Sequence, residues 1–156
     1  MVENVFVVGL DDHSAAILSR LPDAGRYHFH RLLSADELLF RDTIPLPALL
    51  AAAQRQVEAF DGPVHAVIGF WDFPVSTMVP MLCQRLGLRW ASLESVVKCE
   101  HKYWSRLEQQ RVIDEYPRFG LVNFDQPTLP DGLRYLIWVK PIKSVASAPA
   151  YRVDDR

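Results

Sequence analysis

Several features that mark particular protein classes are absent from this sequence of 156 residues. Its two cysteines, Cys83 and Cys99, are too far apart for a CxxC redox or zinc motif, so we expect a reducing compartment. No apolar run approaches the roughly 20 residues needed to cross a bilayer, and no signal peptide with a charged and then an apolar stretch opens the chain. These absences predict a soluble, cytoplasmic protein with no membrane partner.

An excess of charge of one sign is missing as well. Lysine and arginine number 17 against 19 aspartates and glutamates, which gives a formal net charge of −2. The basic residues are scattered singly, without the basic run, zinc-finger spacing or aromatic motif of nucleic-acid-binding proteins. Nucleic acid is therefore not expected as a partner.

Familiar catalytic and metal-binding motifs are also lacking. No serine lies in a GxSxG elbow, and Cys99 beside His101 is a pairing that chance explains. His28 and His30 could offer two imidazoles from one face of a strand, but no third ligand lies nearby in sequence. We therefore expect a hydrogen-bonded histidine pair, no catalytic nucleophile and no metal ligands in the chain.

The sequence does contain an alternation of apolar strand and helix patterns. With 49% hydrophobic residues, the chain can form one good core, or one core and the start of a second. Short apolar runs predict strands, whereas apolar residues at three- and four-residue steps predict helices. We expect strands at residues 5–10, 27–33, 64–70 and 89–92, and helices at residues 15–21, 45–60, 75–86 and 93–98.

Strands separated by helices need crossover connections, which place the strands parallel and the helices on both faces of the sheet. The predicted fold class is therefore α/β, with a small doubly wound, Rossmann-like parallel sheet over residues 1–98. From residue 99 the pattern changes to a polar helix that begins near Lys102, a long irregular stretch and a strand at 136–139. We expect residues 99–156 to form an incomplete α+β subdomain.

Two polar turns follow predicted strands. Ligands of an open α/β sheet bind at the carboxyl ends of the strands, where the strand order reverses. Asp11, Asp12 and His13 follow the first strand, Trp71 and Asp72 follow the third, and all five are candidate substrate contacts. The alternative for the first turn, which lacks a GxGxxG, is helix capping, and for the second it is a hydrophobic staple with a cap.

A lysine at the end of an apolar strand is a more specific signal. Lys140 directly follows the apolar run 136–139, where an ammonium group is costly unless it reaches water or an anion. The residues after it include Lys143, Ser144 and Ser147, among small side chains that let a backbone approach phosphates. Taken alone, each lysine could also be a solvated surface charge.

Three segments resemble the ATP-grasp superfamily, namely residues 100–104 (EHKYW), 116–119 (YPRF) and 138–141 (WVKP). The resemblance runs over the whole chain and implies a pre-ATP-grasp domain at its start, followed by the beginning of the ATP-grasp subdomain. In that family two lysines contact the ATP phosphates. Lys102 and Lys140, which lie 38 residues apart, match them.

This resemblance implies ATP-dependent ligation of a carboxylate to an amine, or to a related nucleophile, through an acylphosphate, with ATP and magnesium as cofactors. It places Lys102, Lys140, Lys143, Ser144 and Ser147 in the nucleotide site. The magnesium ligands of the family come from later strands, so we expect this chain to be a fragment without turnover. The loop after Lys140 also lacks the glycines usual in the family, which predicts a weak ATP site.

Two other classes stay open. A stand-alone α/β module would bind a small molecule or a partner protein through the two turns, with the lysines as surface charges. Association of two copies through the strand at 136–139 would cover apolar surface that an incomplete subdomain leaves exposed. Titration with Mg-ATP separates the ligase fragment from the module, and light scattering tests the association.

Overall fold

The computed structural model describes residues 2–39, 43–125, 128–144 and 150–155. The chain forms two compact units, Met1–Leu93 and Glu94–Arg156, and each is described by itself. The division falls beside the start of helix α5 (Leu93–Glu100), whereas the sequence pattern places a boundary near Lys98. Whether the two units are separate domains stays a prediction.

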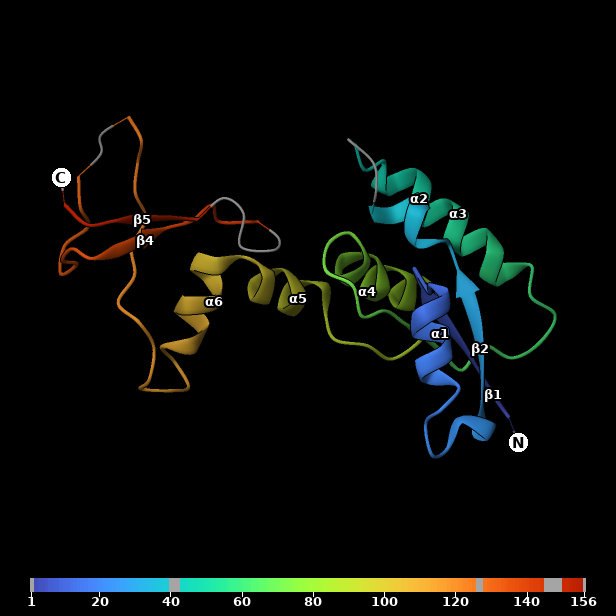
Figure 1. Ribbon diagram of the computed structural model, residues 1–156. Helices are drawn as coiled ribbons and strands as arrows, with labels where there is room; N and C mark the ends of the chain where they lie inside the picture. The colour runs from blue at the N-terminus through green and yellow to red at the C-terminus, as the bar shows by residue number, and fades with distance from the viewer. Residues whose placement is uncertain (1, 40–42, 126–127, 145–149, 156) are drawn as a thin grey trace. The chain divides into compact units, whose positions relative to one another are not determined.

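A three-stranded parallel sheet organises the first unit (Figure 1). Strand β1 (Glu3–Val8) lies in the middle, with β2 (Tyr27–Leu32) on one side and β3 (Ala66–Ile68) on the other. The chain therefore runs from the central strand to one edge and then crosses to the opposite edge. This is the predicted α/β class, and the strand order reverses between β1 and β3.

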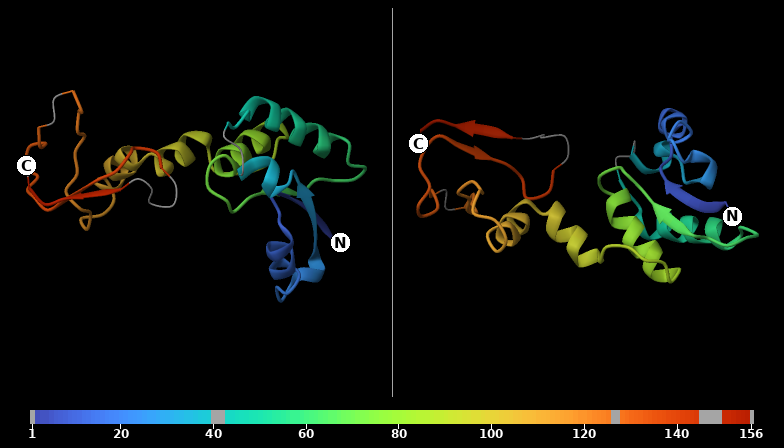
Figure 2. Two further views of the ribbon diagram at one scale, coloured as in Figure 1. Left: turned by 45° about the horizontal axis from the view of Figure 1, so that its top comes forward. Right: turned by 90° about the horizontal axis from the view of Figure 1, so that it is seen from below.

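Helices cover both faces of this sheet. Figure 2 shows α1 (Asp12–Leu18) on one side and α3 (Leu46–Glu58) and α4 (Val75–Arg85) on the other. The short helix α2 (Ala35–Leu39) precedes α3, and a 3₁₀ turn (Ala24–Arg26) leads into β2. The predicted doubly wound arrangement is confirmed.

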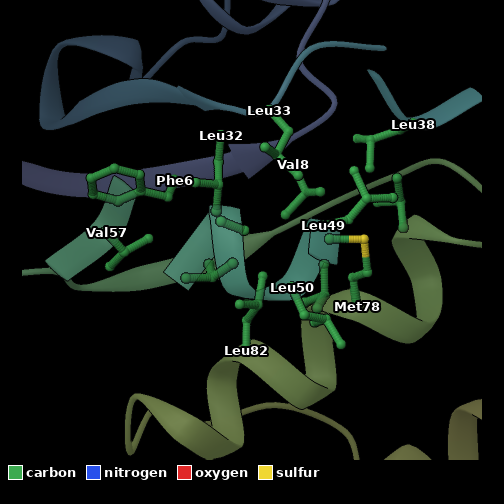
Figure 3. Close-up of a cluster of buried hydrophobic side chains, with 14 of the residues drawn as sticks. Phe6, Val8, Leu32, Leu33, Leu38, Leu49, Leu50, Val57, Met78 and Leu82 are labelled. Carbon is green, nitrogen blue, oxygen red and sulfur yellow. The ribbon is translucent and has the colours of Figure 1, made fainter. Parts of the chain in front are cut away.

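Alternation along the central strand sends side chains into two cores. Phe6 and Val8 join the larger core against α3 and α4, whereas Val5 and Val7 point to the opposite face. Successive side chains of a strand point to opposite faces, so an unbroken apolar run suits a strand buried on both sides. Figure 3 shows the larger core, whose labelled members are Phe6, Val8, Leu32, Leu33, Leu38, Leu49, Leu50, Val57, Met78 and Leu82.

Two helices of the first unit are followed by glycines, and only one of these glycines adopts a left-handed conformation. Helix α4 is followed by Gly87 with φ +68°, the left-handed conformation that glycine adopts at little cost. Gly62, which follows α3, does not adopt this conformation, because it is not among the glycines with a positive φ. Helix α3 instead ends at Ala59, whose N–H donates to the carbonyl oxygens of Arg55 and Val57.

Some local expectations for the first unit are wrong. Residues 89–92 form no strand, and Trp90 is 45% exposed. Helix α1 ends at Leu18, before the predicted end at residue 21, and Ile17 and Leu21 are 52% and 46% exposed. Strand β3 is shorter than the predicted range of residues 64–70.

The second unit combines two helices with a strand pair. Helix α5 is followed by α6 (Lys102–Gln109), and the His101 ring between them caps α6 by accepting a hydrogen bond from the Trp104 N–H at 3.2 Å. Strand β4 (Ile137–Val139) pairs antiparallel with β5 (Tyr151–Val153) (Figure 1). The sequence pattern predicts a strand at 136–139 but none at β5.

The strand pair exposes apolar side chains, with Leu136, Trp138 and Tyr151 more than half exposed. The expected association with a second copy through this surface stays a prediction. Within the described ranges, no helix is both long and apolar enough to cross a membrane.

Candidate functional site

The turn after β1 is shaped by its own side chains. Asp11 caps α1, because its Oδ1 accepts the Ser14 N–H at 2.7 Å and its Oδ2 accepts the Ser14 hydroxyl at 3.0 Å. The Ser14 N–H is the main cause that lowers the pKa of Asp11. Asp12 forms an exposed ion pair with Arg31, and His13 is exposed. Helix capping, the alternative left open for this turn, is therefore present at Asp11.

The turn after β3 packs onto the end of β1. The Trp71 indole N–H donates to the Gly9 carbonyl oxygen at 3.1 Å. Gly9 has φ +72°, and a Cβ built there would lie 3.3 Å from Trp71 Cδ1 and 3.1 Å from Leu38 Cδ1. The structure thus connects the turn after β3 to the end of β1, at the point where the strand order reverses.

Side chains at this reversal point are aromatic and acidic. The Phe70 and Trp71 rings lie 5.9 Å apart, and both are partly exposed. Asp72 is exposed, and its Oδ1 accepts the Phe73 N–H at 2.8 Å. Phe70 was not among the expected contacts, although its position directly after an apolar strand carried the same signal as Trp71. The substrate role of this turn stays a prediction.

The histidine pair packs and hydrogen-bonds. His30 stacks on Phe6 with ring centroids 4.8 Å apart, and its Nε2 lies 3.0 Å from Asn4 Oδ1. Burial, and then the neighbouring His28, lower the pKa of His30. Across the part of the chain that the structure describes, no three His, Cys, Asp or Glu side chains form a group that could hold a metal.

Lys102 opens α6 and reaches the loop after β4 in the second unit. Its Nζ donates to the Ser144 carbonyl oxygen at 2.9 Å and contacts the Ser144 hydroxyl at 3.1 Å. Its backbone N–H donates to the Ile142 carbonyl oxygen at 3.0 Å. Lys102, in the predicted segment 100–104, is therefore bound to the loop that follows the predicted segment 138–141.

Lys140 and Lys143, two further predicted residues of this site, follow β4 closely. Lys143 forms an ion pair with Glu100, whose Oε2 lies 3.2 Å from the Lys143 Nζ. The Lys140 ammonium lies 6.0 Å from the centre of the exposed Trp138 ring, within reach of a cation–π attraction. Ser147 lies outside the described residues.

Glu100 is a residue that the site analysis missed. Its side chain is 12% exposed, and its Oε2 is buried. The sequence offered one signal, because Glu100 opens the segment that resembles the ATP-grasp family. Its pairing with a lysine from a distant loop could not be predicted without the fold.

A hollow of about 290 Å³ between α5 and α6 is lined by apolar and charged side chains. At its rim Lys98 lies 2.9 Å from Glu94 and 3.2 Å from Glu108. The hydrogen bond that Lys98 donates to Glu94 is the main cause that raises the pKa of Lys98, and the one that Lys98 donates to Glu108 is the main cause that lowers the pKa of Glu108. Of these two pairs, Lys98–Glu108 connects α5 to α6, whereas Lys98–Glu94 lies within α5.

The parallel sheet, the helix pair and the small antiparallel strand pair are similar in fold to part of a solved ligase structure. The L-amino acid ligase from Bacillus licheniformis shows this likeness, with a TM-score of 0.66 and 19% sequence identity. The match covers 99% of this chain and 39% of that ligase chain. No protein-family model and no curated protein matches the sequence.

Proposed function

We propose that this chain forms the N-terminal part of an ATP-grasp ligase and contributes two lysines to its nucleotide site. The observation that carries the proposal is the pair of bonds from the Lys102 ammonium to Ser144, within a chain whose fold matches such a ligase. Ser144 lies four residues after Lys140, in the loop that follows β4. These bonds therefore hold Lys102 against the loop that begins at Lys140.

Lysine chemistry suits the proposed role. An ammonium group has three N–H donors, and the contacts with Ser144 occupy two of them in the described structure. A phosphate oxygen can take the third or displace the Ser144 contacts. Lys140 is exposed beside the Trp138 ring, from which it can turn toward an anion. Together the two ammonium groups would offset the negative charge of a triphosphate.

Magnesium does not fit the described residues of this chain, because they hold no cluster of three metal-ligating side chains. The proposed reaction class is ATP-dependent ligation of a carboxylate to an amine. The residues of this chain would bind and position the nucleotide, and the exposed turn at Trp71 and Asp72 would be available to a substrate.

A second candidate is a small-molecule-binding module in the first unit. The hydrogen bond from Trp71 to Gly9 favours it, because this bond connects the turn after β3 to the carboxyl end of β1, where open α/β sheets bind ligands. In this alternative Lys102 and Lys140 act as surface charges. A loss of each ammonium would then leave nucleotide binding unchanged.

Isothermal titration with Mg-ATP tests the proposal on the wild type and on Lys102→Gln and Lys140→Gln. Removing one ammonium–phosphate contact should weaken binding by about tenfold to a hundredfold, since hydrogen bonds to charged groups contribute about 1.5–3 kcal/mol. Lys98→Gln is the matched control, because this lysine pairs with Glu94 and Glu108. No heat with any protein, or equal affinities throughout, would contradict the nucleotide site.

A further inference from the structure

The junction between α5 and α6 is bound to the loop after β4 at three consecutive loop residues. Ile142 accepts the Lys102 N–H, Lys143 pairs with Glu100, and Ser144 binds the Lys102 ammonium. Two residues of the junction, Glu100 and Lys102, make all of these contacts. The position of the Lys102 ammonium is thus coupled to the position of the loop.

Glu100 occupies an unfavourable place for a carboxylate. It is the last residue of α5, where the helix dipole is negative, and its Oε2 is buried. A buried charge is costly unless a partner compensates it. The Lys143 ammonium supplies that partner at ion-pair distance, although the contact lacks the geometry of a hydrogen bond. Glu100 therefore favours the arrangement in which Lys143, and the loop with it, lies against the junction.

The other ion pairs of the second unit differ in burial. Glu94, which pairs with Lys98 on the same helix, is 76% exposed, against 12% for Glu100. Exposed pairs are screened by water and hold geometry weakly. The Glu100–Lys143 pair also joins segments far apart in the sequence, whereas Glu94 and Lys98 lie one helical turn apart.

We infer that Glu100 is a positioning residue, whose pairing with Lys143 anchors the loop so that Ser144 directs the Lys102 ammonium. This inference rests on the proposed nucleotide site for its functional meaning, but the anchoring itself does not depend on nucleotide. It assigns Lys143 to holding the loop and neutralising Glu100, rather than to contacting phosphate. A carboxylate left without this cation would repel a nearby phosphate.

The Lys102 amide is a direct probe of the anchor. As the first residue of α6 it has no acceptor within its own helix, so its N–H depends on the Ile142 carbonyl oxygen. Amide hydrogen exchange measured by NMR, without nucleotide, should be about tenfold or more faster at Lys102 in Glu100→Gln. Glu94→Gln on the same helix is the matched control and should leave the rate unchanged.

Variants of Lys143 complete the test. Lys143→Gln should speed hydrogen exchange at the Lys102 amide, whereas Lys143→Arg should keep the wild-type exchange rate. In the double variant Glu100→Gln/Lys143→Gln, the Lys102 amide should exchange no faster than in either single variant. Circular dichroism checks that each variant is folded. Wild-type exchange at Lys102 in the folded Glu100→Gln protein would overturn the anchor.

Nucleotide binding separates this inference from the proposed function. With a functioning site, Glu100→Gln should weaken Mg-ATP binding by about tenfold, because misplaced contact groups lose much of their effect. Exchange that responds to Glu100→Gln in a protein that binds no Mg-ATP supports the anchor and contradicts the nucleotide site. Mg-ATP binding that depends on Lys102 but not on Glu100, with unchanged exchange, supports the site and overturns the anchor.

Discussion

Gly69 directly follows β3, at a point where the backbone lies close to side chains of helix α4. A Cβ added there would lie 2.4 Å from Val75 Cγ1 and 3.0 Å from Val79 Cγ2. Both valines are at most 1% exposed, so neither can move into solvent. Gly69→Ala should therefore lower the free energy of unfolding by about 1–3 kcal/mol, the usual cost of an overpacked core. For a unit of this size the melting temperature should fall by about 4–8 °C for each kcal/mol.

Urea and thermal unfolding followed by circular dichroism measure this effect. Gly25→Ala is the control, because a Cβ at Gly25 meets no atom within 4 Å and its φ is not left-handed. Its stability should stay the same or rise by up to about 1 kcal/mol, since alanine restricts the unfolded chain. Adding Val75→Ala to Gly69→Ala should relieve the clash, so the double variant loses less than the sum. A Gly69→Ala protein as stable as Gly25→Ala would refute the close approach of β3 and α4.

Two further predictions concern the first unit. Trp71→Phe keeps an aromatic ring but removes the hydrogen bond to Gly9, so the free energy of unfolding should fall by about 0.5–1.5 kcal/mol. Trp90→Phe, at an exposed position, is the control and should change the free energy of unfolding little. Equal urea midpoints for the Trp71→Phe and Trp90→Phe proteins would contradict this contact. Folding lowers the pKa of His30 from its ordinary 6.5, so as the pH falls the unfolded chain binds a proton at this residue before the folded chain does. The stability that neutral His30 contributes to the fold is therefore fully present above pH 6.5 and is lost as the pH falls below it. Urea unfolding at about pH 7.5 and about pH 5.5 should therefore show a smaller loss in His30→Gln than in the wild type, and an identical loss in both would contradict the assignment.

The central strand of the sheet could be predicted from its local sequence. Val5 to Val8 form an unbroken apolar run, which suits a central strand with a core on each face. The helix at Leu46–Glu58 could be predicted because Leu49, Leu50, Ala53 and Val57 share one buried face. In these segments the local pattern and the tertiary packing favour the same structure.

Elements that depend on distant partners escaped prediction. Strand β5 has only three residues and exists through its pairing with β4. The segment at 89–92 has strand-like residues, yet it pairs with no neighbour among the described strands. Propensity alone does not form a strand without a partner for its backbone groups.

The candidate site divides in the same way. Lys140 could be singled out because it follows an apolar strand, and helix capping was an open alternative for the turn after the first strand because aspartate and serine are favoured before a helix. That Asp11 is the capping residue came only from the structure. The contacts of Lys102 with Ser144 and of Glu100 with Lys143 join residues about 40 positions apart, so the fold had to bring them together. The proposed phosphate roles of these residues stay predictions.

The central claim is that Lys102 and Lys140 recognise the phosphates of a nucleotide. The most direct measurement compares the affinities for ATP and AMP, by NMR titration of the wild type, Lys102→Gln and Lys140→Gln. We expect the wild type to prefer ATP and each variant to lose most of this preference, while its affinity for AMP stays the same. A preference for ATP that survives in both variants, or no preference in the wild type, would contradict it.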